Sequence, residues 1–119
     1  QTVDDAIERF FAMLRTDFQN RVLVLVVSEF GRKANLTASL GTDHGHAGLA
    51  LLVGSNVAGG LHSESPSLTA LDPQGSLVPT VDLRRLYATL LDQWLKGDSN
   101  AVLGGTFDPL GLINAAPGA

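Results

Sequence analysis

Regular hydrophobic patterns occur in four stretches of the chain, with polar segments between them. Over residues 3–19 and 83–95, apolar residues recur every three or four positions, which predicts an amphipathic helix in each stretch. Residues 22–28 and 49–53 are short, continuous apolar runs rich in Val and Leu. Runs of this kind are typical of strands that are buried on both faces of a sheet. The pattern predicts an α/β fold in which helices pack on a sheet.

Sequence signals at the ends of these stretches set the expected boundaries of the helices. Thr2 and Thr80 are candidate N-terminal caps, because their hydroxyls can accept hydrogen bonds from the first turn of a helix. Gly97 is the expected stop of the second helix. Beyond it, we expect residues 110–113 to pack onto the body of the protein and residues 114–119 to form a disordered tail.

The longest polar segment lies between the two predicted strands. Residues 31–48 are rich in small and polar residues and show no sustained period, which predicts a long loop. A loop of such length favours a functional role over a purely connecting one. Glu29 directly follows the first predicted strand, and open α/β sheets bind ligands at the carboxyl ends of their strands. Ligand-binding or catalytic residues are therefore expected at Glu29 and in this loop.

Acidic and imidazole side chains are concentrated in the loop. Asp43, His44 and His46 lie within four residues of one another, among glycines that let the backbone bend tightly. Carboxylates and imidazoles are the ordinary ligands of zinc, manganese or iron. A complete site needs a further carboxylate, for which Glu29 is the best-placed candidate. Glu29, Asp43, His44 and His46 are thus the candidate metal ligands.

The same residues are also consistent with a simpler interpretation, a polar surface loop held by hydrogen bonds. Alternate residues along the loop can point apart, and Glu29 can cap a helix or pair with Arg32. His62 lies in a separate polar turn, where exposure to solvent is expected. Asp72 precedes Pro73 and is interpreted as a turn residue.

Composition narrows the range of partners. The net charge is −4 and the basic residues are spread along the chain, which argues against a surface for nucleic acid or anionic membranes. Cysteine is absent, which excludes disulfides and thiolate catalysis, and no apolar run is long enough to span a membrane. Hydrophobic residues make up 45% of the chain and charged residues 17%. We therefore expect either that part of the surface is covered by further chain or by other subunits, as in a homo-oligomer, or that the chain is very well packed.

Four segments also support a family resemblance when they are taken in order. They are Val-Val-Ser-Glu-Phe-Gly-Arg at 26–32, Gly-Thr-Asp-His-Gly-His at 41–46, Leu-Leu-Val-Gly-Ser-Asn-Val-Ala-Gly-Gly at 51–60 and Val-Asp-Leu-Arg-Arg-Leu-Tyr-Ala-Thr-Leu-Leu at 81–91. Together they resemble the C-terminal part of the family known as domain of unknown function 1501, a sulfatase-like branch of the alkaline phosphatase superfamily. The resemblance covers about residues 5–113.

The resemblance implies a fold and an activity. The fold is α/β, with a mixed, mostly parallel sheet flanked by helices, and the substrate is a small-molecule ester of phosphate or sulfate. The divalent metal is expected to be zinc or manganese, with calcium or magnesium as alternatives. Residues 1–119 would be a single partial domain of a longer parent exported to the periplasm or the outside of the cell. The superfamily's nucleophile segment has no counterpart here, so the chain alone is expected to be inactive.

Two alignments of the metal ligands are open under this resemblance. One places Asp43 and His44 on the superfamily's Asp-His-Gly by letter match. The other follows strand order and puts Glu29 in the Asp position and His44 or His46 at a later His. The second is favoured because His46 lies immediately before the second predicted strand.

The favoured alignment also suggests roles for two neighbouring residues. Phe30 replaces a ligand His, which impairs one of the two metal sites. Arg32 is expected to contact the oxyanion through its planar set of donors. The alternative function is a non-catalytic binding or assembly module that keeps the fold, and both Phe30 and the apolar composition favour it.

Overall fold

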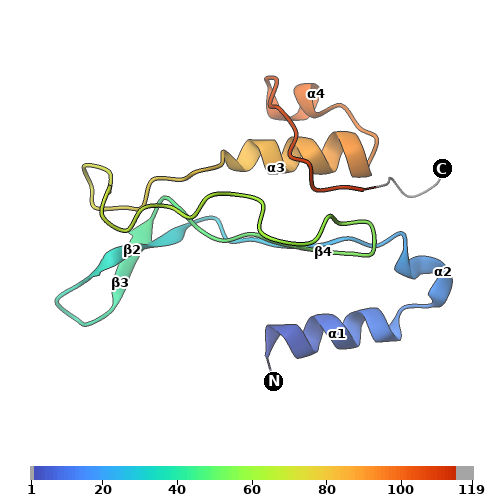
Figure 1. The fold of residues 1–119 in the computed structure, drawn as a ribbon, viewed down its shortest axis with the longest axis horizontal. Coiled ribbons are helices and arrows are strands. Elements are labelled where there is room, and N and C mark those ends of the chain that lie inside the picture. Colours follow the sequence, from blue (N-terminus) through green and yellow to red (C-terminus); the bar gives the residue numbers. More distant parts are fainter. Residues whose placement is uncertain (1, 115–119) are drawn as a thin grey trace.

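The computed structural model describes residues 2–114 (Figure 1). Along the chain, helices α1 and α2 are followed by strands β1 to β4, helix α3, the π-helical turn η1 and helix α4. Their bounds are α1 Val3–Met13, α2 Thr16–Gln19, β1 Val24–Val26, β2 Gly31–Leu36, β3 Thr42–Gly45, β4 Leu51–Val53, α3 Leu83–Thr89, η1 Leu90–Trp94 and α4 Ser99–Leu103.

The strands form two separate two-stranded sheets, and both sheets are antiparallel. β1 pairs with β4, with Leu25 opposite Leu52, and β2 pairs with β3. The expected mixed, mostly parallel sheet of the alkaline phosphatase type is therefore wrong for residues 2–114. The physical reason lies in the connection between β1 and β4. A parallel pair needs a crossover, usually a helix, whereas residues 27–50 contain a hairpin that returns the chain beside β1 in the opposite direction.

The first predicted helix is present but is divided into α1 and α2. The predicted cap is confirmed, because the Thr2 hydroxyl accepts a hydrogen bond from the Asp5 N–H at 3.2 Å and the Asp5 carboxylate accepts one from the Thr2 N–H at 3.0 Å. At the break, the Gln19 side-chain amide donates to the carbonyl groups of Phe11 and Leu14. The Phe11 carbonyl also accepts from the Leu14 N–H at 3.2 Å, so the side chain of Gln19 adds to the bonds that close the end of α1.

The second predicted helix runs as α3 and continues into η1. Its cap is Asp82 and not Thr80, because the Asp82 carboxylate accepts from the Arg84 N–H at 2.9 Å, while the Thr80 hydroxyl donates to the Glu64 carbonyl at 2.8 Å. Asp82 directly precedes the first helical residue, which is the position from which a side chain reaches the free N–H groups of the first turn. The helical stretch ends before Gly97, as predicted.

The β1–β4 pair lies between two helical layers. In Figure 1, α1 lies on one side of this pair, and α3 with α4 lies on the other. On the α1 side, an apolar groove is lined by residues of α1 and one residue of β1, namely Val3, Ala6, Ile7, Phe10 and Val24. The pair itself contributes only three residues from each strand, so the sheet between the helices is small.

The C-terminal segment lies along the chain that follows β4. Val57 forms an isolated bridge with Ile113, and the Ala58 N–H donates to the Leu112 carbonyl at 2.8 Å. The prediction that residues 110–113 pack onto the body is therefore confirmed. Asn114, the first residue of the expected tail, donates its N–H to the Asn56 carbonyl at 2.9 Å. The rest of that tail, residues 115–119, lies outside the described residues.

The buried core is small and centres on α3. Its apolar members are Leu86, Ala88 and Leu112. Thr89 is fully buried, and its hydroxyl donates to the Arg85 carbonyl at 2.7 Å and accepts from the Leu110 N–H at 2.7 Å. Thr89 thus fastens the C-terminal segment to the helix while satisfying its own hydroxyl.

The described chain leaves much of its apolar surface exposed. Its radius of gyration is 16.8 Å, whereas a compact domain of this length has a radius of about 13.5 Å. Large apolar side chains are exposed on several elements and loops, among them Met13, Leu40 and Leu61.

None of the helices in residues 2–114 has the length and apolar character that a membrane crossing requires.

Replacing Thr89 by Val should lower the free energy of unfolding by about 1–3 kcal/mol, because the partly buried Leu110 N–H loses its acceptor. The control is Thr89→Ser, which keeps the hydroxyl and should lose only about 1 kcal/mol for the missing methyl group. Urea denaturation of the two variants measures the difference. Equal stabilities would show that this hydrogen bond does not hold the C-terminal segment.

Candidate functional site

Most of the candidate chemistry lies on the β2–β3 hairpin, whose strands approach closely at two glycines. Gly31 pairs with Gly45. A Cβ on Gly31 would lie 1.5 Å from the carbonyl oxygen of Ala47, and a Cβ on Gly45 would lie 2.8 Å from the carbonyl carbon of Arg32. Both positions are therefore closed to any side chain without movement of the backbone. The close approach also places Arg32 directly opposite His44.

One face of the hairpin joins Arg32, Phe30 and His44. Because paired residues of antiparallel strands project from the same face, Arg32 and His44 share a face. The Phe30 ring stacks on the His44 imidazole with centroids 3.6 Å apart and an interplanar angle of 16°. The Arg32 Cζ atom lies 5.7 Å from the Phe30 ring centre, and its Nη1 donates to the Thr42 carbonyl at 2.8 Å. Phe30 therefore holds the His44 ring by stacking, and Arg32 uses one of its donors on the backbone.

Asp43 belongs to a different environment from His44, its neighbour in the chain. The Asp43 carboxylate lies 3.6 Å from the Lys33 ammonium group and accepts from the His44 N–H at 2.9 Å. This backbone hydrogen bond, followed by the Lys33 charge, lowers the pKa of Asp43. Since successive residues of a strand project from opposite faces, the side chains of Asp43 and His44 diverge. The expectation that alternate residues can point apart is confirmed here.

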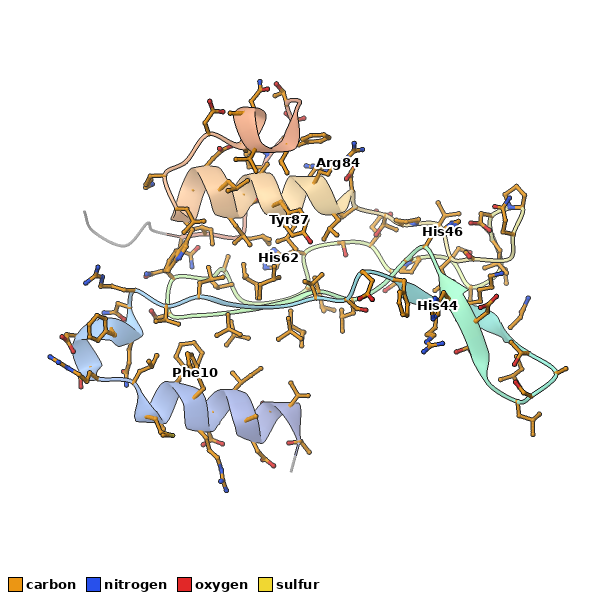
Figure 2. All side chains as sticks on the ribbon, turned by 180° about the vertical axis from the view of Figure 1, so that it is seen from behind. Phe10, His44, His46, His62, Arg84 and Tyr87 are labelled. Atoms are coloured by element: carbon orange, nitrogen blue, oxygen red, sulfur yellow. The ribbon has the colours of Figure 1, made fainter. Side chains whose placement is uncertain are left out.

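His46, just beyond β3, pairs with a carboxylate from a distant loop. Its Nδ1 lies 2.7 Å from Oδ2 of Asp72. The Asp72 side chain is 15% exposed and the His46 side chain 62% exposed. The carboxylate is therefore enclosed while most of the imidazole faces solvent. Figure 2 shows His44 and His46 at the same end of the molecule, away from Phe10 on α1.

A tight turn fixes the Asp72 carboxylate. Oδ1 of Asp72 accepts from the N–H groups of Gln74 at 2.9 Å and Ser76 at 2.8 Å, and Leu71 bridges Leu77 at the base of the turn. The hydrogen bond from Ser76 is the main cause of a lowered pKa at Asp72. The interpretation of Asp72 as a turn residue is confirmed. Its pairing with His46 was not predicted, because a turn signal in the sequence does not identify a distant partner.

His46 also lines a shallow groove at the start of α3. The groove has a volume of about 380 Å³ and is bounded by His46, Pro79, Val81, Asp82 and Leu83. The Asp82 carboxylate lies 2.6 Å from Nη2 of Arg84, and this contact is the main cause that lowers the pKa of Asp82 to about 2. The groove therefore combines apolar walls, a carboxylate paired with its own Arg, and the exposed His46 imidazole.

The predicted metal ligands do not converge in the described part of the chain. Glu29 accepts a hydrogen bond from the Ser28 hydroxyl at 3.4 Å, Asp43 pairs with Lys33, and the two imidazoles have separate partners. No group of three or more His, Cys, Asp or Glu side chains within residues 2–114 is arranged to hold a metal ion. Metal binding by these residues therefore stays a prediction of the resemblance.

The comparisons with known proteins identify the family. A family model described as "Protein of unknown function (DUF1501)" matches residues 1–105. The chain therefore belongs to this family, as the resemblance of its four segments implied. No curated protein and no solved structure matches the chain.

Replacing Gly31 by Ala should lower the free energy of unfolding by about 1–3 kcal/mol, because the new methyl group forces the hairpin backbone to move. The matched control is Gly41→Ala on the same hairpin, where the new Cβ would lie 3.8 Å from the Thr37 hydroxyl, an ordinary contact distance. Urea denaturation compares the two variants. If both lose the same stability, the close approach of Gly31 to Ala47 is not a constraint on the fold.

Proposed function

We propose that this chain contributes a proton-transfer site to the hydrolysis of phosphate or sulfate esters, with His46 as the proton-transfer group. The observation that carries the proposal is the arrangement around His46. One ring nitrogen contacts the Asp72 carboxylate at 2.7 Å, while the ring is largely exposed and lines a groove. An imidazole with one nitrogen held by a carboxylate and the other free is well suited to general acid–base catalysis.

In the proposed reaction, the free nitrogen of His46 takes the proton of the attacking hydroxyl group. It then returns a proton to the oxygen of the leaving alcohol as the bond from phosphorus or sulfur to that oxygen breaks. The attacking group comes from water or from a part of the parent outside this chain. General acid–base catalysis of this kind contributes typically 10²–10⁴-fold to a rate.

Arg32 has the proposed role of binding the anionic end of the ester. Its guanidinium uses Nη1 for the Thr42 carbonyl and lies against the Phe30 ring, which limits its movement. The planar group still has other donors, and such donors match pairs of oxygens on a phosphate or sulfate group. The ester class itself is supported by the resemblance to the sulfatase-like branch.

The role of a divalent metal stays a prediction of that resemblance, as does export of the parent. Glu29, Asp43, His44 and His46 are its predicted ligands, but these side chains have separate partners in the structure. A metal at any of them would need ligands beyond the described residues. No step of the proposed reaction therefore passes through a metal.

Replacing His46 by Gln in the intact protein should lower kcat for hydrolysis of aryl phosphate or aryl sulfate by about 10²–10⁴-fold, because the proton-transfer group is lost. The control is His62→Gln, since His62 lies in a separate turn with its Nε2 2.6 Å from the Ala58 carbonyl oxygen. Release of the coloured phenolate measures turnover. Equal activity of the two variants would contradict the proposal.

A second candidate function is that of a binding or assembly module. The apolar surface around β1 and β4 favours it: Val26, Val27, Leu49 and Leu51 are exposed on or beside these strands. The β1–β4 sheet has only two strands, so the outer edge of each strand lacks a neighbouring strand in residues 2–114. Exposed apolar side chains beside unpaired sheet edges are features that association would bury.

Under this second function, the chain should associate reversibly through the exposed apolar side chains on and beside β1 and β4. Light scattering over a range of protein concentrations should show a mass that rises with concentration in the wild type, and Val27→Asp with Leu51→Asp should abolish the rise because charges oppose burial. The matched control is Leu61→Asp, an exposed site outside these strands. A monomer at all concentrations would contradict this function.

A further inference from the structure

The turn that holds Asp72 is built more firmly than a connecting loop requires. Oδ1 of Asp72 accepts two backbone N–H groups, and the Asp72 N–H itself donates to the Ser76 carbonyl at 2.9 Å. The Gly75 N–H closes the turn on the Asp72 carbonyl at 2.9 Å. Ser76 is 1% exposed. The carboxylate is thus fixed in place before it meets any group from outside the turn.

Because Oδ1 is used by the turn, Oδ2 remains for His46. An ionised carboxylate can only accept hydrogen bonds, so the contact of 2.7 Å requires a proton on Nδ1 of His46. A neutral imidazole carries a single N–H, and its other nitrogen then has a free lone pair. The lone pair of neutral His46 is therefore on Nε2.

We propose that Asp72 is a positioning residue, which holds His46 in the Nδ1–H tautomer and thereby presents the Nε2 lone pair for proton transfer. This inference rests on the proposed function for its role in catalysis, but the tautomer itself does not depend on any activity. Asp72 touches neither the ester nor the reacting atoms. It acts through the ring that it orients.

The substitution Asp72→Asn gives a sharp test, because the turn determines how the new side-chain amide lies. The oxygen of that amide takes the place of Oδ1, where two N–H groups need an acceptor. The amide nitrogen then takes the place of Oδ2 and donates to Nδ1 of His46. This exchange forces the proton to Nε2 and removes the free lone pair, with little change of shape.

The measurement is a long-range proton–nitrogen NMR correlation of the imidazole rings, recorded on the intact protein at a pH where they are neutral. The wild type should show His46 mainly as the Nδ1–H tautomer, and Asp72→Asn should show it mainly as the Nε2–H tautomer. The rings of His44 and His62 should not change. The matched control is Ser76→Ala, which removes a hydroxyl that has no hydrogen-bond partner among the described residues but keeps the backbone N–H that holds Asp72.

The wild-type spectrum alone overturns the inference if Nδ1 of His46 carries no proton, even if the variant fails to fold. An unchanged tautomer in folded Asp72→Asn overturns it as well. In the same preparations, kcat should fall by roughly 10²-fold or more with KM little changed, as for loss of a proton-transfer group. A switch of the tautomer without a fall in kcat would support the positioning role and contradict the proposed function, so the two failures are distinguishable.

Discussion

The close approach of Gly31 and Gly45 is the constraint on which the arrangement of the hairpin depends. At these two positions the strands leave no room for a Cβ, and the backbone of Ala47 passes next to Gly31. This contact sets the register that places Arg32 opposite His44. Beyond Arg32 the pairing shifts, so that Leu36 lies opposite Thr42.

The register separates chemistry that the sequence presents as one cluster. His44 stacks on Phe30 on one face of the hairpin, and Asp43 pairs with Lys33. The alternation of strand side chains keeps these two groups apart. His46, beyond the end of β3, reaches a carboxylate from elsewhere in the fold, because the turn around Asp72 presents its free oxygen there. A metal centre needs several ligands that converge on one point, whereas proton transfer needs only the His46 imidazole and the Asp72 carboxylate.

The structure also has an exposed apolar surface in addition to the polar site around His46. Helical layers lie on both sides of the β1–β4 pair, yet within residues 2–114 the buried apolar side chains are confined to α3 and the C-terminal segment (Figure 1). Thr89 joins these two parts through its hydroxyl. The exposed apolar side chains lie on or beside β1 and β4, whereas His46 follows β3, so association and catalysis would use different residues of the same chain.

The sequence by itself determined the helical stretches over residues 3–19 and 83–95 and the cap at Thr2, since a period of three or four residues and a capping hydroxyl depend on local geometry alone. It did not determine the break between α1 and α2, the cap at Asp82 or helix α4. It also carried the four segments that place the chain in its family. It did not determine whether β1 and β4 run parallel or antiparallel, because a continuous apolar run is compatible with a buried strand of either orientation. Nor did it indicate that Asp72 would meet His46, since a turn signal specifies a local backbone shape. Only the tertiary structure decided those two outcomes. The hairpin between β1 and β4 sets the strand direction. The fold also brings together two residues far apart in the chain, with Nδ1 of His46 2.7 Å from Oδ2 of Asp72.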